Sequence, residues 1–151
     1  MRIGDISRYI GIAAGLCIAA WTTPLHANKQ CYAPDARAQE RAFSRAVTTE
    51  GGKTLWLGGQ TASLPPVANF DAQVRDVFAS IEKTLKAQGG SLKDIVTMTV
   101  FITDMANGTR FTQLRKEFFQ EGRYPASALI GIKELARPEM MVEIQAIAVV
   151  D

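Results

Sequence analysis

The stretch Met140-Met-Val-Glu-Ile-Gln-Ala-Ile-Ala-Val-Val150 alternates in the way that a β-strand requires. One face of the expected strand is wholly apolar and consists of Val142, Ile144, Ala146, Ala148 and Val150. The other face carries Glu143 and Gln145 among apolar neighbours. A carboxylate and an amide in so hydrophobic a strand need hydrogen-bonding partners, which either water or a lined cleft would supply. We therefore expect helices over the first face, and both alternatives stay open for the second.

The rest of the chain predicts an α+β fold with the element order β-β-α-β-α-β-β, in which helices cover one side of a mixed sheet. The other expected strands are 43–49, 54–57, 95–103 and 128–132, and the expected helices are 70–88 and about 108–120. The first helix has one apolar stripe, an N-cap at Asn69 and a glycine pair at its end. Residues 50–53 are typical of a β-hairpin turn between the first two strands.

The N-terminal segment has the pattern of a secretory signal peptide. Arg2 and Arg8 flank a polar start, residues 10–21 are apolar, and Leu25 and Ala27 suit a signal peptidase. The apolar run is shorter than the ~20 residues that span a bilayer, which favours a cleaved signal over a membrane anchor. We expect residues 1–27 to be this signal, 28–41 a polar N-terminal arm, and 42–151 the folded domain of a secreted or periplasmic protein.

Cleavage after Ala27 would remove His26, which is the only histidine of the chain, together with Cys17. The mature protein would then have no His-based catalytic triad and no His-ligated metal site. Cys31 would remain as a lone thiol, either inert or able to join two chains. A net charge of +2 without a basic run gives no reason to expect nucleic acid or an anionic membrane as a partner.

Two further features point toward a shared site. The pair Gly58-Gly59 follows a strand, where glycine permits a bend, a bulge or a close backbone approach. The face of the sheet away from the helices would carry Phe101, Ile147 and Val149, which are too apolar for a comfortable monomer. This composition favours a symmetric oligomer.

Four phrases in order closely resemble the RidA/YjgF family of imine deaminases. They are Leu57-Gly-Gly-Gln60, Asp94-Ile-Val-Thr-Met-Thr-Val-Phe-Ile-Thr-Asp104, Tyr124-Pro-Ala126 and Val142-Glu-Ile-Gln-Ala-Ile-Ala-Val149. The resemblance covers about residues 43–150. It implies a chorismate-mutase-like fold and a homotrimeric barrel with ligand clefts between subunits. It also implies cofactor-independent hydrolysis of 2-imino and enamine acids, such as 2-iminopropanoate and 2-iminobutanoate, to 2-oxo acids and ammonia.

The resemblance also assigns the site residues. Glu143 matches the family's water-positioning catalytic carboxylate, and Gly59 and Gln60 are retained as substrate-binding positions. Phe43, Gly58 and Thr112 stand where active members carry a tyrosine, often a serine, and commonly an asparagine. The family arginine that grips the substrate carboxylate directly follows the Pro-Ala pair, and here that substrate-binding position is Ser127. No metal ligand is implied.

A serine offers one donor and no charge, so it cannot replace a guanidinium. Losing the partner of a buried charged group costs about 2–5 kcal/mol. Deamination would then be lost or altered, with a small ligand, such as an imino or oxo acid, in the cleft.

Two alternatives remain. Another arginine holds the substrate, with Arg45, Arg115, Arg123 and Arg137 as candidates and Arg137 or Arg123 favoured. Otherwise the protein is a non-enzymatic holdase or ligand-binding module. RNA cleavage is disfavoured because no basic patch is evident. The expected partner is the chain itself as a homotrimer, with no nucleic acid and no membrane after signal cleavage.

Overall fold

The computed structural model describes residues 26–33, 35–63 and 69–151. The expected signal sequence lies almost wholly outside these ranges and stays a prediction. The elements are β1 (Asn28–Tyr32), α1 (Ala36–Glu40), β2 (Ala46–Glu50), β3 (Lys53–Thr61), α2 (Phe70–Ala87), η1 (Leu92–Asp94), β4 (Ile95–Ile102), η2 (Met105–Asn107), α3 (Gly108–Arg115), β5 (Ala126–Gly131) and β6 (Val142–Val150). From β2 onward this order is the predicted β-β-α-β-α-β-β. None of the described helices is both long and apolar enough to cross a membrane.

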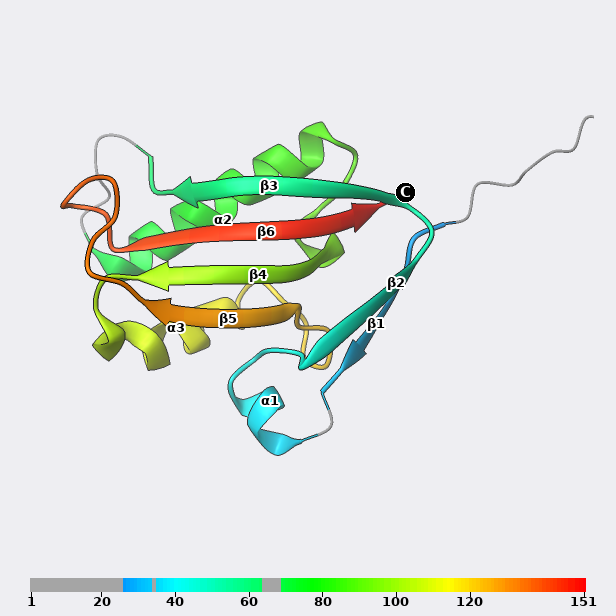
Figure 1. The fold of residues 1–151 in the computed structure, drawn as a ribbon, viewed down its shortest axis with the longest axis horizontal. Coiled ribbons are helices and arrows are strands. Elements are labelled where there is room, and N and C mark those ends of the chain that lie inside the picture. The colour runs from blue at the N-terminus through cyan, green and yellow to red at the C-terminus, as the bar shows by residue number, and fades with distance from the viewer. Residues whose placement is uncertain (1–25, 34, 64–68) are drawn as a thin grey trace, which may run out of the picture.

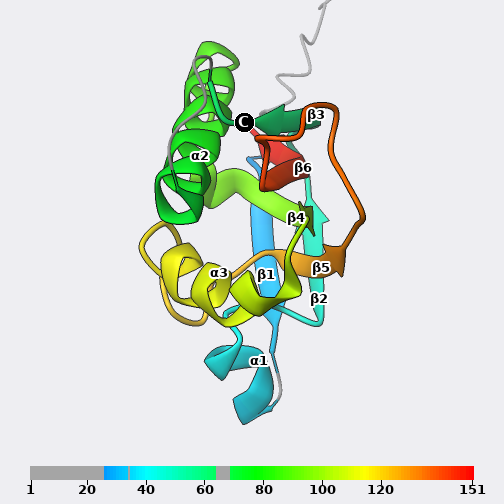
Figure 2. The ribbon, with the colours of Figure 1, turned by 90° about the vertical axis from the view of Figure 1, so that its left-hand side faces the viewer.

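The fold has two layers, a four-stranded sheet and the helices that cover one of its faces (Figures 1 and 2). The strand order is β3-β6-β4-β5, with β6 antiparallel to both neighbours and β5 parallel to β4. The predicted alternation of β6 is confirmed, since the residues from Val142 to Val150 at every second position are buried under the helices. The apolar stripe of α2 packs on this face, and Asn69 caps the helix by accepting a hydrogen bond from the Ala72 amide at 2.9 Å.

The N-terminal part differs from the prediction in two ways. The sequence of residues 28–41 predicts a polar arm. In the structure this segment contains β1 and α1, and β1 pairs with β2 in a separate two-stranded sheet. The two strands are held together by main-chain hydrogen bonds, which depend little on side-chain type. The polar side chains of β1 therefore show no apolar alternation from which a strand could be predicted. Residues 50–53 do not form a hairpin turn, because β2 and β3 belong to different sheets. Gly51 and Gly52, both at positive φ, instead turn the chain from one sheet into the other.

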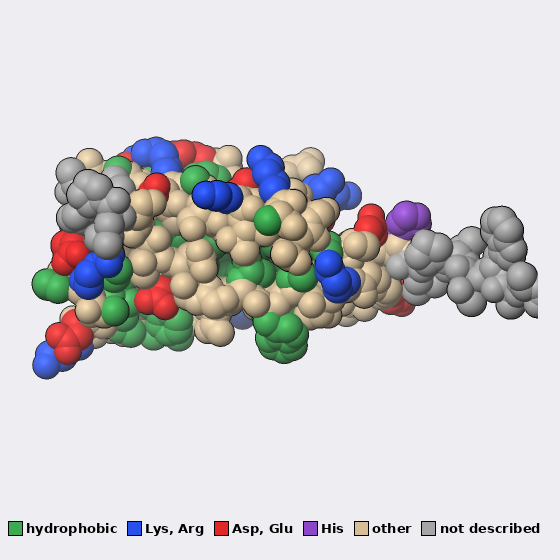
Figure 3. Space-filling model, turned by 90° about the horizontal axis from the view of Figure 1, so that it is seen from above, with side chains coloured by type: hydrophobic (Ala, Val, Ile, Leu, Met, Phe, Trp, Pro, Cys, Tyr) green, Lys and Arg blue, Asp and Glu red, His purple; other side chains and the backbone are tan. Residues whose placement is uncertain are grey.

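The uncovered face of the main sheet is apolar. Trp56 is 78% exposed and lies opposite Ile147, and Ile130 is 41% exposed and lies opposite Phe101. In Figure 3 hydrophobic side chains protrude on the sheet side at the bottom of the view, whereas charged side chains gather at the top, on the helix side. A face of this kind is typical of a subunit interface.

Candidate functional site

The acidic half of the predicted site lies on β3 and β6 and consists of Glu143, Gly58 and Gly59. The pairing of these strands shifts between Leu57 and Gln60, where three steps along β3 match two along β6. The extra residue makes a β-bulge at the glycine pair. A Cβ on Gly59 would lie only 1.8 Å from Oε1 of Glu143, so a glycine is required there for the carboxylate to lie against β3. A Cβ on Gly58 would meet nothing within 4 Å.

The Gln60 side chain points to the other side of the sheet from Glu143. Its Oε1 accepts a hydrogen bond from the Ser80 hydroxyl of α2 at 3.0 Å. Its cross-strand partner is the buried Ile144, so this side chain lies on the helix side of the sheet, whereas Glu143 lies on the uncovered side. Within one protomer Gln60 therefore ties β3 to α2.

The basic half of the site surrounds Ser127 at the start of β5. The Ser127 hydroxyl accepts a hydrogen bond from Nη1 of Arg115 at 2.8 Å, and Nη2 of the same side chain donates to the Arg41 carbonyl at 2.6 Å. Arg115 is only 4% exposed, and its Cζ lies 5.2 Å from the centroid of the Phe111 ring. The structure thus places a guanidinium directly beside Ser127, the position at which the resemblance implies an arginine.

Arg115 is a buried cation with no counter-ion among the residues that the structure describes. It forms no ion pair with any carboxylate in the described ranges, and its buried Nε has no hydrogen-bond partner there. Burial, followed by the nearby charge of Arg41, lowers the pKa of Arg115 to about 10, so it still carries its charge at neutral pH. A buried charge of this kind is costly unless an anion pairs with it.

The spacing of residues in the sequence could have indicated that Arg115 is buried. Position 115 follows Phe111 by four residues and precedes Phe118 by three, which puts it on the apolar face of α3. The arginines that the sequence favoured lie elsewhere in the protomer. Arg137 lies in the loop after β5, with its Nε 2.8 Å from Oε1 of Glu139, and Arg123 lines a different hollow. Neither of them lines the hollow beside Ser127.

That hollow, which we call the arginine pocket, has a volume of about 280 Å³ and lies between α1, α3 and β5. Its lining consists of Arg37, Arg41, Phe43, Arg45, Arg115, Ser127 and Leu129. The prediction that the protein has no basic patch is therefore wrong, because the fold gathers arginines from segments that are far apart in sequence. Thr112 is buried one turn before Arg115, where its hydroxyl donates to the Gly108 carbonyl at 3.1 Å, and it does not line the pocket.

The two halves do not meet within one protomer. Ser127 lies opposite the buried Met98 of β4, which in turn lies opposite the buried Ala146 of β6. Ser127 therefore belongs to the helix side of the sheet, whereas Glu143 belongs to the uncovered side. Within one protomer, a ligand held by Arg115 would therefore not contact Glu143.

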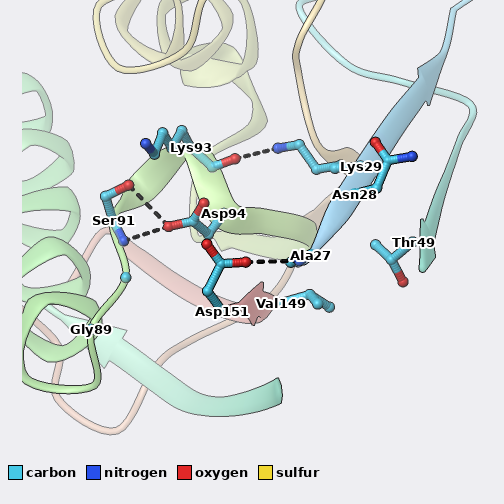
Figure 4. Close-up of a pocket in the computed structure, with 11 residues that line it drawn as sticks. Ala27, Asn28, Lys29, Thr49, Gly89, Ser91, Lys93, Asp94, Val149 and Asp151 are labelled. Carbon is cyan, nitrogen blue, oxygen red and sulfur yellow. Dashed lines mark hydrogen bonds between the residues drawn. The ribbon is translucent and has the colours of Figure 1, made fainter. Parts of the chain in front are cut away.

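A separate hollow of about 270 Å³ lies where the N-terminal segment meets the end of the main sheet (Figure 4). Its polar groups are engaged with one another. Lys29 donates to the carbonyls of Lys93 and Ile95, and its burial lowers its pKa. The Asp151 carboxylate accepts from the Ala27 amide at 2.7 Å. These contacts attach β1 to the rest of the domain. In the described ranges no group of His, Cys, Asp and Glu is arranged to hold a metal ion.

Comparisons with known proteins agree on one group of relatives. The family model described as Endoribonuclease L-PSP matches residues 33–150. A RutC family protein of Pyrococcus horikoshii is 29% identical over 111 residues, which cover 70% of this chain and 85% of that protein. A 2-iminobutanoate/2-iminopropanoate deaminase of Dermatophagoides farinae is 28% identical, with 72% and 86% covered. The crystal structure of YyfB from Yersinia pestis, described as a protein of the conserved Rid family, matches with a TM-score of 0.71 and 25% identity over 83% of this chain and all of that one.

Proposed function

The chain belongs to the RidA/YjgF family, and from this premise we propose that it hydrolyses 2-imino or enamine acids without a cofactor, with Arg115 in place of the missing family arginine. The observation that carries this proposal is the buried guanidinium of Arg115, 2.8 Å from the Ser127 hydroxyl and without a carboxylate partner among the described residues. A substrate carboxylate would supply the counter-ion that the protomer lacks.

The chemistry needs little beyond this anchor. A protonated 2-imino acid carries an electrophilic carbon next to its carboxylate, and Arg115 would hold that carboxylate through the N–H groups that are not used by Ser127 and Arg41. Glu143 would orient a water molecule and take its proton as the oxygen attacks the imine carbon. Glu143 would then return this proton to the amino group of the carbinolamine. The C–N bond breaks as the hydroxyl loses its proton and forms the C=O bond, so ammonia leaves and takes up the released proton as ammonium, and a 2-oxo acid remains.

We propose that each complete site lies between two copies of a homotrimer. The support is that Glu143 and Arg115 lie on opposite sides of one sheet, and that the uncovered side exposes Trp56 and Ile130. Burying this apolar face against neighbouring sheets would remove it from water and bring Glu143 of one copy toward the arginine pocket of the next. Light scattering on the purified protein tests the trimer, and a monomer at working concentration would contradict it.

Turnover of freshly generated 2-iminopropanoate tests the activity. The imine can be produced from alanine by an amino-acid oxidase, and its disappearance followed by trapping with semicarbazide. We expect turnover by the wild-type protein and a loss of about 30-fold to several-thousand-fold in kcat/KM for Arg115→Met, because a buried charged contact is removed. Lys116→Met is the matched control, since Lys116 is exposed and does not line the pocket. An unchanged kcat/KM in Arg115→Met would contradict the proposal that Arg115 binds the substrate carboxylate.

A further inference from the structure

The arginine pocket holds more positive charge than one carboxylate requires. A single guanidinium can bind a carboxylate in a bidentate manner, and Arg115 is sufficient for that task. Arg37 and Arg41 line the same pocket, and neither of their side chains forms an ion pair with a described residue. Arg45 differs, because its Nε and Nη2 donate to Oδ2 of Asp35 at 3.1 and 2.9 Å. Among the described residues, the guanidinium groups of Arg37, Arg41 and Arg115 therefore form no ion pair.

The N-terminal segment is fastened so that these charges stay at the pocket. Asp35 caps α1 by accepting a hydrogen bond from the Ala38 amide at 2.8 Å, and the helix ends at Arg41. The Arg41 carbonyl accepts from Arg115 at 2.6 Å, which joins the end of α1 to α3. The next residue, Ala42, is fully buried with a φ of 54°, a conformation that costs a non-glycine residue free energy. This turn leads directly to Phe43 in the pocket wall.

We propose that the ligand of this pocket carries a second anionic group besides its 2-carboxylate, and that Arg41 and Arg37 bind this second group. The inference rests on the proposed function, because Arg115 is taken to hold the 2-carboxylate. The pocket volume of about 280 Å³ suits a small acid. The chemical class is then a 2-imino acid of four or five carbons whose side chain ends in a carboxylate, or one whose side chain bears a phosphate.

Calorimetric titration of the full-length wild-type protein tests the inference with three probes. Pyruvate carries one carboxylate, 2-oxoglutarate carries two, and 2-phosphoglycolate carries a carboxylate and a phosphate. The latter two probes each have two anionic groups, and we call them the dianions for this reason, although the phosphate itself carries up to two charges. We expect both to bind about tenfold more tightly than pyruvate, because each gains a second charge-assisted contact. The tighter of the two identifies the second group as a carboxylate or a phosphate.

Variants assign the preference to individual residues. Arg41→Gln and Arg37→Gln should each reduce dianion affinity by about threefold to tenfold and leave pyruvate affinity within about twofold, because Arg115 is untouched. Lys116→Gln removes the same charge from an exposed position outside the pocket and should change neither affinity.

The outcomes separate the two proposals. Equal affinities for pyruvate and both dianions, or a preference that survives the Arg37→Gln/Arg41→Gln double variant, would overturn the second anionic group and leave the proposed function in place. Failure of all three probes to bind a correctly assembled protein would overturn both.

Discussion

The acidic and basic halves of the proposed site are built by different means. The acidic half is built within the sheet, since a bulge at Gly58-Gly59 makes room on β3 for the Glu143 carboxylate of the neighbouring strand. The basic half depends on tertiary contacts, because Arg115 of α3 reaches Ser127 of β5 and the carbonyl that ends α1. The structure thus keeps a guanidinium 2.8 Å from the hydroxyl of Ser127, the position at which the resemblance implies an arginine.

The largest effect should come from the acidic half and should appear in turnover. Glu143→Gln keeps the shape of the side chain but removes its ability to accept a proton, so kcat should fall by about 10²- to 10⁴-fold. Pyruvate affinity, measured by calorimetry, should stay within about twofold, because the basic half is intact. A variant that loses pyruvate affinity to the same extent as turnover would show that the two halves do not divide catalysis and binding in this way.

The next effect tests whether Arg115 takes the role that the resemblance gives to an arginine at position 127. Arg115→Met should lose pyruvate affinity by at least about 30-fold, and Ser127→Arg added to that variant should restore most of it, by returning the guanidinium to the usual family position. Thermal unfolding should show Arg115→Met within about 1 kcal/mol of the wild type or more stable, because a buried charge without a counter-ion is replaced by an apolar side chain. Destabilisation by several kcal/mol would instead assign Arg115 a structural role.

A smaller effect is expected from the glycine pair. Gly59→Ala should lower kcat by about tenfold, since the added methyl group displaces the Glu143 carboxylate from β3 and misaligns the attacking water. Gly58→Ala is the matched control, because its methyl group would meet nothing within 4 Å. Equal activities of the two variants, with both proteins assembled, would mean that Glu143 does not act from this position.

The smallest effect concerns pH. The pKa of Arg115 is about 10, so pyruvate affinity should fall by about half near pH 10 and continue to fall above it, as the guanidinium loses its proton. As the pH rises, Arg115 also loses its proton at a lower pH in the folded state than in the unfolded state, because its pKa is lowered by folding. The stability of the wild type relative to Arg115→Met should therefore rise between about pH 10 and the ordinary arginine pKa. Calorimetry and urea unfolding at a series of pH values measure both trends, and affinity that stays constant to pH 11 would contradict the lowered pKa.

Local patterns determined most of the fold. The alternation from Val142 to Val150, the stripe of α2 and its cap at Asn69 identify elements whose burial follows from periodicity alone. The glycine pair left a bend, a bulge and a close backbone approach open, and the structure shows a bulge with the Glu143 carboxylate against Gly59. In contrast, β1 carries polar side chains and is held by main-chain pairing, so nothing in its composition distinguished it from an arm.

By itself, then, the sequence determined the α+β architecture and the family phrases, and the resemblance that these phrases carry implies roles for positions 143 and 127. Only the tertiary structure decided that Arg115 donates to Ser127, that Arg37 and Arg41 line the same pocket, and that Ser127 and Glu143 lie on opposite sides of one sheet. The physical reason is that periodicity reports which face of an element is buried, whereas the arginines of α1 and α3 and the serine of β5 come together only when the elements pack.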